Sequence, residues 1–387
     1  MAGVSKNDKG IIIMKNILLL YTPISQKHLV DSIISHTIDD HYEITGFNVN
    51  DWTFNNGTTE LPALFKYVKL LKRIKYFGQR ITNRLVTLLL ILLSKKFDYI
   101  DVTFFMPIYY GFLDYLIKVG KPYKITIWGS DFYRSKQKDL EKKRVYLNKA
   151  KIIQVETEVF KKDIVKVFPE LESKIAVCNY GIDLLDVIDS LGNNEPLVPD
   201  AKGKIVVTCG YNATQGQQHS IIVSSLQKMQ EGTKNKIFLF FPMTYGAANN
   251  NYINNIENEL INTGIPFKMF RERLSDYDLA KLRLQTDIVV NVQVTDALAS
   301  SLIEHLYAGG ILIAGEWLPY SIFTDNGIQY IKTSLEDLSA NLESAINGIE
   351  ELKEVKVHNR KGAKIIASWS TRSKALKELF LNLIDNY

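Results

Sequence analysis

The stretch "DIVVNVQVTDALASSLIEHLYAGGILIAGE", residues 287–316, decides the fold of this 387-residue chain. It places two short apolar runs, 287–292 and 311–316, on either side of a segment with helical spacing that begins near Leu298–Ser300. Short β-branched runs predict strands, and the order strand, helix, strand is typical of a parallel βαβ unit. The paired glycines before the second run allow a tight turn into it.

The same alternation extends over most of the chain, with amphipathic or charged helices between the apolar runs. The strand-like runs outside 287–316 are 15–22, 42–49, 98–105, 123–129, 151–157, 174–181, 204–210, 236–243 and 266–270. This pattern predicts parallel sheets that are covered by helices on both faces.

A stretch rich in Gly, Asn and Pro, without periodicity, separates two similar halves. We therefore expect an α/β protein with two Rossmann-like, doubly wound domains and an amphipathic final helix. The expected parts are an N-terminal domain over 14–190, a linker over 191–203, a C-terminal domain over 204–368 and the last helix over 369–387.

The composition is that of a globular protein, with 46% hydrophobic and 23% charged residues, which argues against intrinsic disorder. Two cysteines are too few for a disulfide framework or a cysteine metal cluster. The chain has no Walker loop, no GxGxxG after the first strand and no HExxH motif. We therefore expect no metal and no cofactor.

Residues 61–97 carry nine Lys and Arg and no Asp or Glu, although the net charge of the chain is only +5. Aromatic residues interleave these cations, and the apolar run that follows, 85–93, is shorter than the ~20 residues that span a bilayer. A basic amphipathic helix before a buried one fits an anionic membrane surface. Nucleic acid and a merely solvated helix face are the alternatives. We expect the membrane surface and no nucleic acid.

Two carboxylates, Asp296 and Glu304, surround the predicted start of the helix in 287–316. Ser300, Ser301 and unpaired backbone N–H groups lie at its positive end, where a phosphate is favoured. Glu304 follows one turn later, on the same side as both serines. This arrangement predicts a nucleotide site with phosphates on the amides and ribose hydroxyls on Glu304. An ordinary helix cap with a surface glutamate is the alternative.

The segment "DALASSLIEHLYAGGILIAG", residues 296–315, resembles the signature of family 4 glycosyltransferases. That signature is a carboxylate, seven residues, a second Glu and a small-residue turn into a strand. The preceding residues also resemble the family's layout, with a helix capped by Ser275 or Asp276, and the resemblance covers about 266–320.

The resemblance implies the GT-B fold, in which two Rossmann-like domains face each other across a cleft and the last helix packs back on the N-terminal domain. It also implies transfer of a sugar from a nucleotide-diphosphate donor. Asp296 would then face the donor sugar and Glu304 would bind the donor ribose. Asp in place of the family's usual Glu shortens the reach by one methylene.

The loop "GYNATQGQQH", residues 210–219, departs from the family, which usually has an Arg and a Lys there to neutralise the diphosphate. A leaving diphosphate needs hydrogen-bond donors or cations. We expect Arg271 to supply the charge. The loop residues expected to bind the donor are Gly210, Asn212, Thr214 and His219.

This loop and residues 241–264 also resemble a second GT-B family, which transfers 4-acetamido-4,6-dideoxygalactose from a TDP-linked donor to a lipid-linked sugar. "IWGSDFYR", residues 127–134, resembles the Trp-Gly-x-Asp-x-Tyr segment of that family. Asp131 would orient or deprotonate the acceptor hydroxyl there, or else cap the next helix.

The first family retains and the second inverts the anomeric configuration, so retention and inversion with Asp131 as base both stay open, with retention expected. The expected enzyme is a metal-independent bacterial glycosyltransferase of surface polysaccharide or glycolipid synthesis. Its acceptor would be a glycan or a lipid-linked sugar, and its place the cytoplasm or the inner face of the cytoplasmic membrane. A nucleotide-sugar epimerase of the same fold and a membrane-binding or nucleic-acid-binding module are the alternatives.

Overall fold

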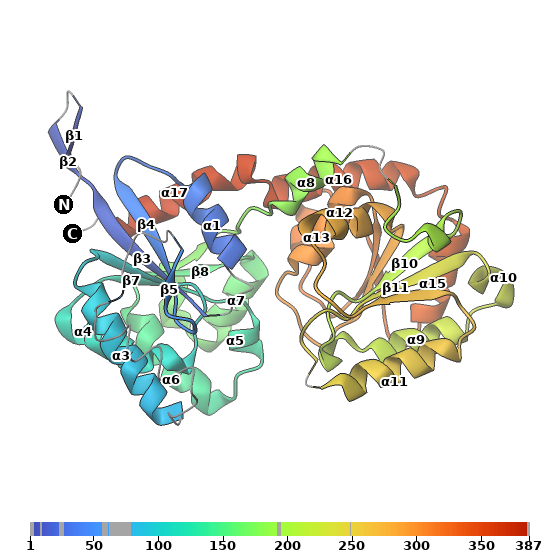
Figure 1. Ribbon diagram of the computed structural model, residues 1–387, viewed down its shortest axis with the longest axis horizontal. Coiled ribbons are helices and arrows are strands. Elements are labelled where there is room, and N and C mark those ends of the chain that lie inside the picture. Colours follow the sequence, from blue (N-terminus) through green and yellow to red (C-terminus); the bar gives the residue numbers. More distant parts are fainter. Residues whose placement is uncertain are drawn as a thin grey trace. The chain divides into compact units, whose positions relative to one another are not determined.

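The computed structural model describes residues 4–7, 10–22, 27–55, 61, 79–191, 195–247 and 249–384. The chain divides into two compact units, each with its own parallel sheet (Figure 1). Unit 1 consists of residues 1–181 and 369–387, and unit 2 consists of residues 182–368. The prediction of an α/β protein with two parallel-sheet domains is confirmed.

Unit 1 contains a seven-stranded sheet with the order β5-β4-β3-β6-β7-β8-β9. Only β5 is antiparallel to its neighbour. The order reverses between β3 and β6, as it does in doubly wound folds. The strands are β3 (Lys15–Tyr21), β4 (Tyr42–Asn48), β5 (Thr53–Phe54), β6 (Tyr99–Val102), β7 (Tyr123–Thr126), β8 (Ile152–Val155) and β9 (Ile175–Val177), and a hairpin of β1 (Val4–Asn7) and β2 (Gly10–Ile13) precedes them.

Helices cover both faces of this sheet, because successive side chains of a strand point to opposite faces and β3 buries them on both. Ile17 and Leu19 pack with α1 and α17, and α3, α4 and α6 lie on the other side (Figure 1). The α-helices in the described part of unit 1 are α1 (Lys27–His36), α3 (Gln79–Ser94), α4 (Tyr110–Val119), α5 (Ser130–Tyr133), α6 (Gln137–Lys149), α7 (Glu158–Val167) and α17 (Trp369–Ile384).

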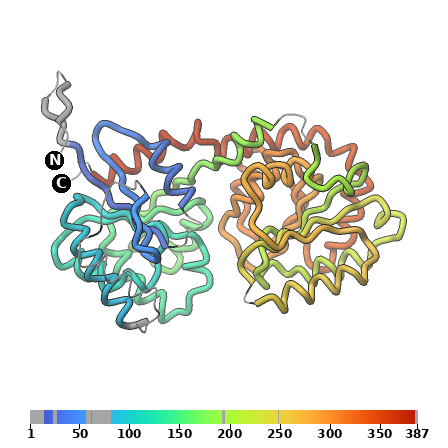
Figure 2. Tube along the Cα trace, in the orientation of Figure 1, coloured from blue at the N-terminus to red at the C-terminus, as the bar shows by residue number. Residues whose placement is uncertain are grey.

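The last helix, α17, belongs to unit 1 although it follows the whole of unit 2 in the sequence (Figure 2). Its apolar face packs into the core beside β3 and α1. Two hydrogen bonds fix its end: Tyr99 Oη donates to the carbonyl of Ile384 (3.0 Å) and Lys151 Nζ donates to that of Leu383 (2.6 Å). The expected return of the last helix to the first domain is therefore confirmed.

A buried ion pair lies inside this sheet, on the face that α17 covers. Lys124 of β7 contacts Asp101 of β6 (2.9 Å) and donates to Gln154 of β8 (2.7 Å), and its ammonium group faces the ring of Phe380. Burial raises the pKa of Asp101, and the neighbouring ammonium opposes this rise. The pair links three adjacent strands below the helix.

Unit 2 contains a six-stranded, wholly parallel sheet with the order β12-β11-β10-β13-β14-β15. This is the Rossmann order, with the switch point between β10 and β13. The strands are β10 (Ile205–Cys209), β11 (Ile237–Pro242), β12 (Phe267–Phe270), β13 (Ile288–Asn291), β14 (Ile311–Gly315) and β15 (Ile331–Thr333).

Two helical layers cover the sheet of unit 2 (Figure 1). One layer consists of α9 (His219–Gln227), α11 (Asn250–Ile261) and α15 (Leu338–Asn347), and the other of α8 (Leu184–Ser190), α12 (Asp276–Gln285), α13 (Ser300–Ala308), α14 (Ser321–Asp325) and α16 (Lys353–Ala367). The short α10 (Glu231–Lys234) precedes β11. Alternate side chains of β13 pack against the two layers: Ile288 and Val290 pack on one side of the sheet, and Val289 packs on the other.

The boundary between the units differs from the expected one. The chain passes from unit 1 to unit 2 after Gly181, so residues 182–190 belong to unit 2. The reason is α8, whose Leu184, Leu185 and Ile188 pack against α12 and α13. The described part of the expected linker is also packed, since Val198 and Ala201 are buried beside β10 and β11.

The basic stretch 61–97 is described only at residue 61 and from residue 79 onward, and the cations between lie outside the described residues. Its described part contains α3, which leaves Ile81, Leu88 and Leu92 exposed at 49%, 54% and 40%. Within the described residues, no helix combines the length and the apolar character that crossing a membrane requires.

Candidate functional site

The carboxyl edge of the unit 2 sheet brings most of the predicted residues together. All six strands are parallel, so the loops after β10, β11, β12 and β13 leave from the same edge. The loop of residues 210–219 follows β10 and the loop of residues 292–299 follows β13, on either side of the switch point. Ligands of open α/β sheets bind at such a point.

Gly210 opens the first loop in a conformation that favours glycine, with φ at +67°. A Cβ at this position would lie 2.8 Å from His219 Nε2 and 2.9 Å from Gln217 Oε1. Asn212 then turns the loop, because its Oδ1 accepts from the backbone N–H (2.9 Å) and the hydroxyl (2.7 Å) of Thr214. The loop backbone is therefore fixed from inside.

His219 lies beneath this loop and is fully buried. Its Nδ1 is 2.9 Å from the hydroxyl of Tyr252, and burial lowers the pKa of its imidazole to about 4. The ring is therefore neutral at physiological pH. In this structure His219 supports Gly210 from behind, whereas the sequence predicted that it contacts the diphosphate.

The loop after β11 packs against the loop after β10. The backbone N–H of Ala213 donates to the carbonyl of Tyr245 (2.7 Å), and a Cβ at Gly246 would lie 2.6 Å from the Thr214 methyl group. The side chain of Tyr245 lies within electrostatic reach of Glu304 and Arg273. The phenol is thus placed close to the predicted ribose-binding carboxylate.

Asp296 is held on both of its oxygens. Its Oδ2 accepts from the hydroxyl of Tyr320 (2.6 Å), and its Oδ1 accepts from the backbone N–H of Ala297 (3.0 Å). Tyr320 is itself located by Asn291 Nδ2, which donates to its hydroxyl (2.6 Å). The carboxylate is therefore oriented by buried side chains behind it.

Glu304 is held in a similar way by Arg283 of α12. The Nε and Nη2 atoms of Arg283 both lie 3.0 Å from Glu304 Oε2. Its Nη1 lies 2.9 Å from Nε2 of His305. All three side chains are buried. Arg283 was not predicted as a site residue, because its only signal in the sequence is a charged residue between two leucines of a helix.

The start of α13 carries the two predicted serines. Ser300 is exposed, and the Oγ of Ser301 is buried without a hydrogen-bond partner among the described residues. Ala299 caps the helix and gives no side-chain hydrogen bond to it. The first N–H groups of α13 are therefore not satisfied by a capping side chain, which suits an anion.

Arg271 follows β12 and is engaged elsewhere. Its Nη2 pairs with Glu257 of α11 (2.6 Å) and its Nη1 donates to Asn254 (3.0 Å). Both partners are on α11, so the guanidinium points along that helix. The expectation that Arg271 supplies the charge for a diphosphate finds no support in these contacts.

Tyr211 and Gln293 join the two loops at the switch point. The Tyr211 hydroxyl exchanges hydrogen bonds with the Gln293 amide (3.2 and 3.1 Å), and Gln217 Nε2 also donates to Gln293 (3.0 Å). Trp317 Nε1 donates to the carbonyl of Gln293 (2.9 Å). Burial and the Asp296 carboxylate raise the pKa of the Tyr211 phenol. Neutral residues thus stand where the resembling family has cations.

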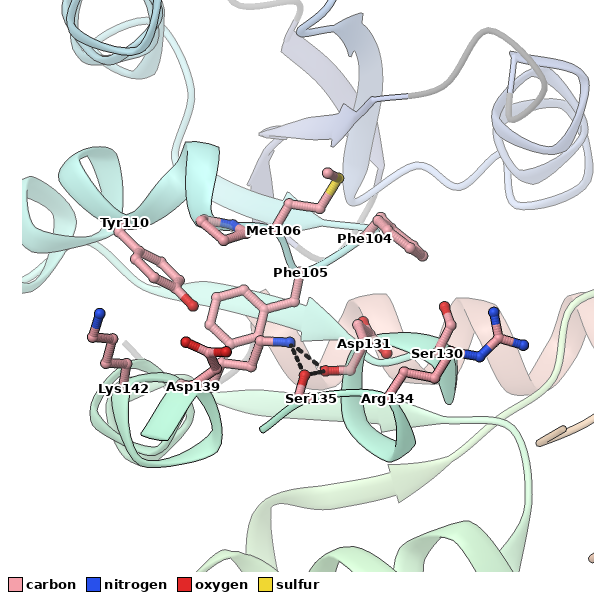
Figure 3. Close-up of a pocket in the computed structure, with 12 residues that line it drawn as sticks. Phe104, Phe105, Met106, Tyr110, Ser130, Asp131, Arg134, Ser135, Asp139 and Lys142 are labelled. Atoms are coloured by element: carbon pink, nitrogen blue, oxygen red, sulfur yellow. Dashed lines mark hydrogen bonds between the residues drawn. The ribbon is translucent and has the colours of Figure 1, made fainter. Parts of the chain in front are cut away.

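Asp131 lies in unit 1, beside a cavity of about 500 Å³ beyond β6 and β7 (Figure 3). Its Oδ1 accepts from the backbone N–H of Trp128 (2.9 Å), and its Oδ2 is buried without a partner among the described residues. Burial raises the pKa of Asp131 to about 6, and the neighbouring Lys143 opposes the rise. A carboxylate with this pKa is suited to accept a proton near neutral pH.

Lys143 holds the turn that carries Asp131. Its Nζ donates to the backbone carbonyl of Asp131 and to Ser135 Oγ (3.0 Å), as the dashed lines in Figure 3 show. The same cavity is lined by aromatic and charged side chains, namely Phe104, Phe105, Tyr110, Arg134, Asp139 and Lys142. Aromatic faces together with charged groups suit a polar ring such as a sugar.

Among the described residues, no group of three or more His, Cys, Asp or Glu is placed to hold a metal ion.

The comparisons with known proteins agree on the fold. A glycosyltransferase from Rickettsia africae ESF-5 superposes with a TM-score of 0.68 at 14% identity, over 97% of this chain and 100% of that one. The fold is GT-B. Anabaena Alr3699/HepE in complex with UDP and glucose gives a TM-score of 0.69 at 12% identity, over 95% of this chain and 99% of that one.

A third match is a UDP-forming α,α-trehalose-phosphate synthase from Burkholderia xenovorans, with a TM-score of 0.67 at 11% identity, over 97% of this chain and 99% of that one. No family model matches the sequence, and the search of curated proteins finds no match. The likeness is therefore one of fold.

Proposed function

We propose that this GT-B protein is a glycosyltransferase that moves a sugar from a nucleotide-diphosphate donor to an acceptor hydroxyl. The observation that carries the proposal is the carboxyl edge of the unit 2 sheet, where the start of α13, which has no capping side chain, and two oriented carboxylates lie at the switch point. Proteins of the same fold include one solved with UDP-glucose and one described as UDP-forming, which supports a nucleotide-sugar donor.

The donor would bind with its diphosphate at the first N–H groups of α13 and at the loop that begins with Gly210. Fixed N–H dipoles stabilise the negative charge that grows on the leaving diphosphate and need no metal for this. Glu304 would accept hydrogen bonds from the pentose hydroxyls, and Asp296 would face the sugar. These are the roles that the sequence predicted for Glu304 and Asp296, and we propose them for the same two residues.

Asp131 would act as the base that deprotonates the acceptor hydroxyl. The hydroxyl oxygen then attacks the anomeric carbon, the bond from that carbon to the diphosphate breaks, and the nucleoside diphosphate leaves. Such a direct displacement inverts the anomeric configuration. The raised pKa of Asp131 suits the general base that inversion requires.

The acceptor would be a glycan or a lipid-linked sugar, presented at the inner face of a bacterial cytoplasmic membrane during polysaccharide or glycolipid synthesis. The basic stretch 61–97 supports this view by its charge, and the exposed apolar side chains of α3 support it by their position in the same segment. Binding to vesicles with 30% anionic lipid, compared with neutral vesicles, tests this part separately.

The donor class is tested by thermal-shift screening of the full chain against UDP, GDP, TDP and CMP. We expect one nucleotide to raise Tm, and we expect Glu304→Gln to lose most of that rise. A screen without any shift at millimolar nucleotide would count against the donor site. NMR analysis of the product anomer then separates inversion from retention, and donor conversion without any acceptor would indicate an epimerase.

A further inference from the structure

Arg283 is a buried arginine whose contacts converge on two consecutive residues of a neighbouring helix. It comes from α12, it is 4% exposed, and its guanidinium meets Glu304 and His305 of α13. The contacts join helices of the same layer of unit 2, and both helices pack in one apolar cluster. The geometry therefore belongs to a single packed body.

The position of the guanidinium is defined from two sides. Nε and Nη2 both reach the same carboxylate oxygen, Oε2 of Glu304, at 3.0 Å. Nη1 reaches Nε2 of His305 at 2.9 Å. Burial and the adjacent guanidinium lower the pKa of His305 well below its ordinary value, so the imidazole is neutral and its Nε2 accepts. This hydrogen bond assigns the ring proton to Nδ1.

The other oxygen of Glu304 is left available. Among the described residues no hydrogen bond reaches Oε1, while Oε2 takes both contacts from Arg283. A glutamate side chain has three rotatable bonds, and a guanidinium that is also held by His305 restricts the freedom of the carboxylate. The pair thus presents one oriented acceptor one turn into α13.

Stability alone is a poor reason for this arrangement. A buried ion pair gains little over well-packed apolar residues, because both charges must leave water. The helix that carries Arg283, α12, packs with α8 and α13 in an apolar cluster, so apolar side chains are compatible with this interface. Packing does not require a charged side chain at position 283, whereas a role in orienting the Glu304 carboxylate does.

We propose that Arg283 is a positioning residue that holds Glu304 by Oε2, so that Oε1 accepts hydrogen bonds from the pentose hydroxyls of the donor nucleotide. The proposal rests on the proposed function, because it concerns the ribose contact of the same donor site. It also predicts a selective defect. Loss of Arg283 weakens recognition of the pentose hydroxyls and leaves the contacts to the diphosphate in place.

The test uses the full chain and a pair of nucleotides that differ only in the pentose. The tightest binder among UDP, GDP and TDP is compared by titration calorimetry with its 2′,3′-dideoxy analogue. Hydrogen bonds to a charged group discriminate by about 10- to 100-fold, which is the ratio of affinities expected for the wild type. For Arg283→Gln we expect a ratio below about 3-fold, with the affinity for the dideoxy analogue changed by less than about 3-fold.

Three further variants and one control variant test the role of Arg283 more closely. Arg283→Lys keeps the positive charge but loses the planar guanidinium, so we expect an intermediate ratio of affinities. This variant replaces Arg283→Gln in the test if the glutamine variant does not fold. Glu304→Gln and the double variant Arg283→Gln/Glu304→Gln are expected to give the same ratio, because Arg283 acts through Glu304. The matched control is Arg360→Gln, which removes an exposed ion pair with Asp189 and a contact to the carbonyl of Tyr307 on the same α13. Its ratio should equal that of the wild type.

The possible failures are distinguishable. A ratio that stays at the wild-type value in Arg283→Gln and Arg283→Lys, whether overall affinity falls or not, overturns the positioning role and leaves the donor site intact. If none of the three nucleotides binds the wild type, the proposed function falls, and the role of Arg283 falls with it.

Discussion

Replacing Asp131 by asparagine should stabilise unit 1 at neutral pH and abolish sugar transfer. Burial raises the pKa of this carboxyl from 3.8 to about 6. At about 1.4 kcal/mol per pKa unit, the rise corresponds to about 3 kcal/mol that the folded chain loses when Asp131 ionises. Asparagine avoids this cost, because it is neutral at every pH.

The sign of the effect follows from proton binding. Folded Asp131 holds its proton more tightly than the unfolded side chain, whose pKa is about 3.9. The free energy of unfolding of the wild type therefore falls as pH rises from about 4 to about 6, and it remains lower above that range. The advantage of Asp131→Asn should grow by about 2 kcal/mol between pH 4 and pH 8. The new Nδ2 group of the asparagine has no hydrogen-bond partner, which lowers the free energy of unfolding of the variant by about 1 kcal/mol at every pH.

The assay is urea unfolding at pH 4 and pH 8, followed by tryptophan fluorescence. Three of the four tryptophans, Trp52, Trp128 and Trp369, are in unit 1, so Trp317→Phe as background restricts the signal to that unit. Asp139→Asn is the matched control, because Asp139 lines the same cavity but is exposed. The Asp139→Asn substitution should change the free energy of unfolding by less than about 0.5 kcal/mol at both pH values.

Transfer is measured in parallel. Loss of a general base typically lowers the rate by about 10²- to 10⁴-fold, and kcat/KM of the wild type should fall below pH 6 as Asp131 becomes protonated. The reasoning is refuted if Asp131→Asn gains no stability between pH 4 and pH 8. The assignment of the base is refuted if the variant retains transfer within about 3-fold of the wild type.

Three other substitutions probe the supports around the sites. Gly210→Ala should destabilise the loop by about 1–3 kcal/mol, because residue 210 has a positive φ and a Cβ there would lie too close to its neighbours. We expect a lower Tm and weaker nucleotide binding in calorimetry. Tyr320→Phe removes the hydrogen bond to Asp296 and should lower kcat about 10-fold with little change in KM, and an unchanged kcat would show that this bond is dispensable. Lys124→Met should cost about 3–5 kcal/mol in urea unfolding by leaving Asp101 unpaired, whereas Lys124→Met with Asp101→Leu should be near neutral.

The fold could be predicted because it depends on local patterns. The runs 287–292 and 311–316 contain β13 and β14, and Ser275 caps α12 by accepting from the N–H of Asp278 (3.1 Å). Such strands are buried on both faces and therefore consist of continuous apolar residues, which a sequence displays directly. The unit boundary was missed because α8 is placed by contacts with α12 and α13, about a hundred residues further along the chain.

The individual site residues were harder to predict, because burial and pairing depend on tertiary contacts. Polar residues of a glycine-rich loop all look like ligand contacts in a sequence, yet His219 is turned beneath Gly210. Arg271 looked available as a cation, but its partner Glu257 comes from a different helix. Arg283 went unnoticed, since Glu304 is 21 residues away and nothing local announces the pair.

Two of the charged residues at this edge of unit 2, Glu304 and Arg271, are paired with other side chains. Arg283 neutralises Glu304 from behind, and Glu257 neutralises Arg271. The neutral donors for a diphosphate are the first N–H groups of α13 and the loop after β10, and Arg273, which lies within electrostatic reach of Tyr245, is a cation at the same edge. Fixed dipoles can stabilise developing charge without reorganising, but only if their backbone is held rigidly. The hydrogen bonds from Thr214 to Asn212 and from Gln217 to Gln293 supply that rigidity, so a loop without Lys or Arg is compatible with diphosphate departure.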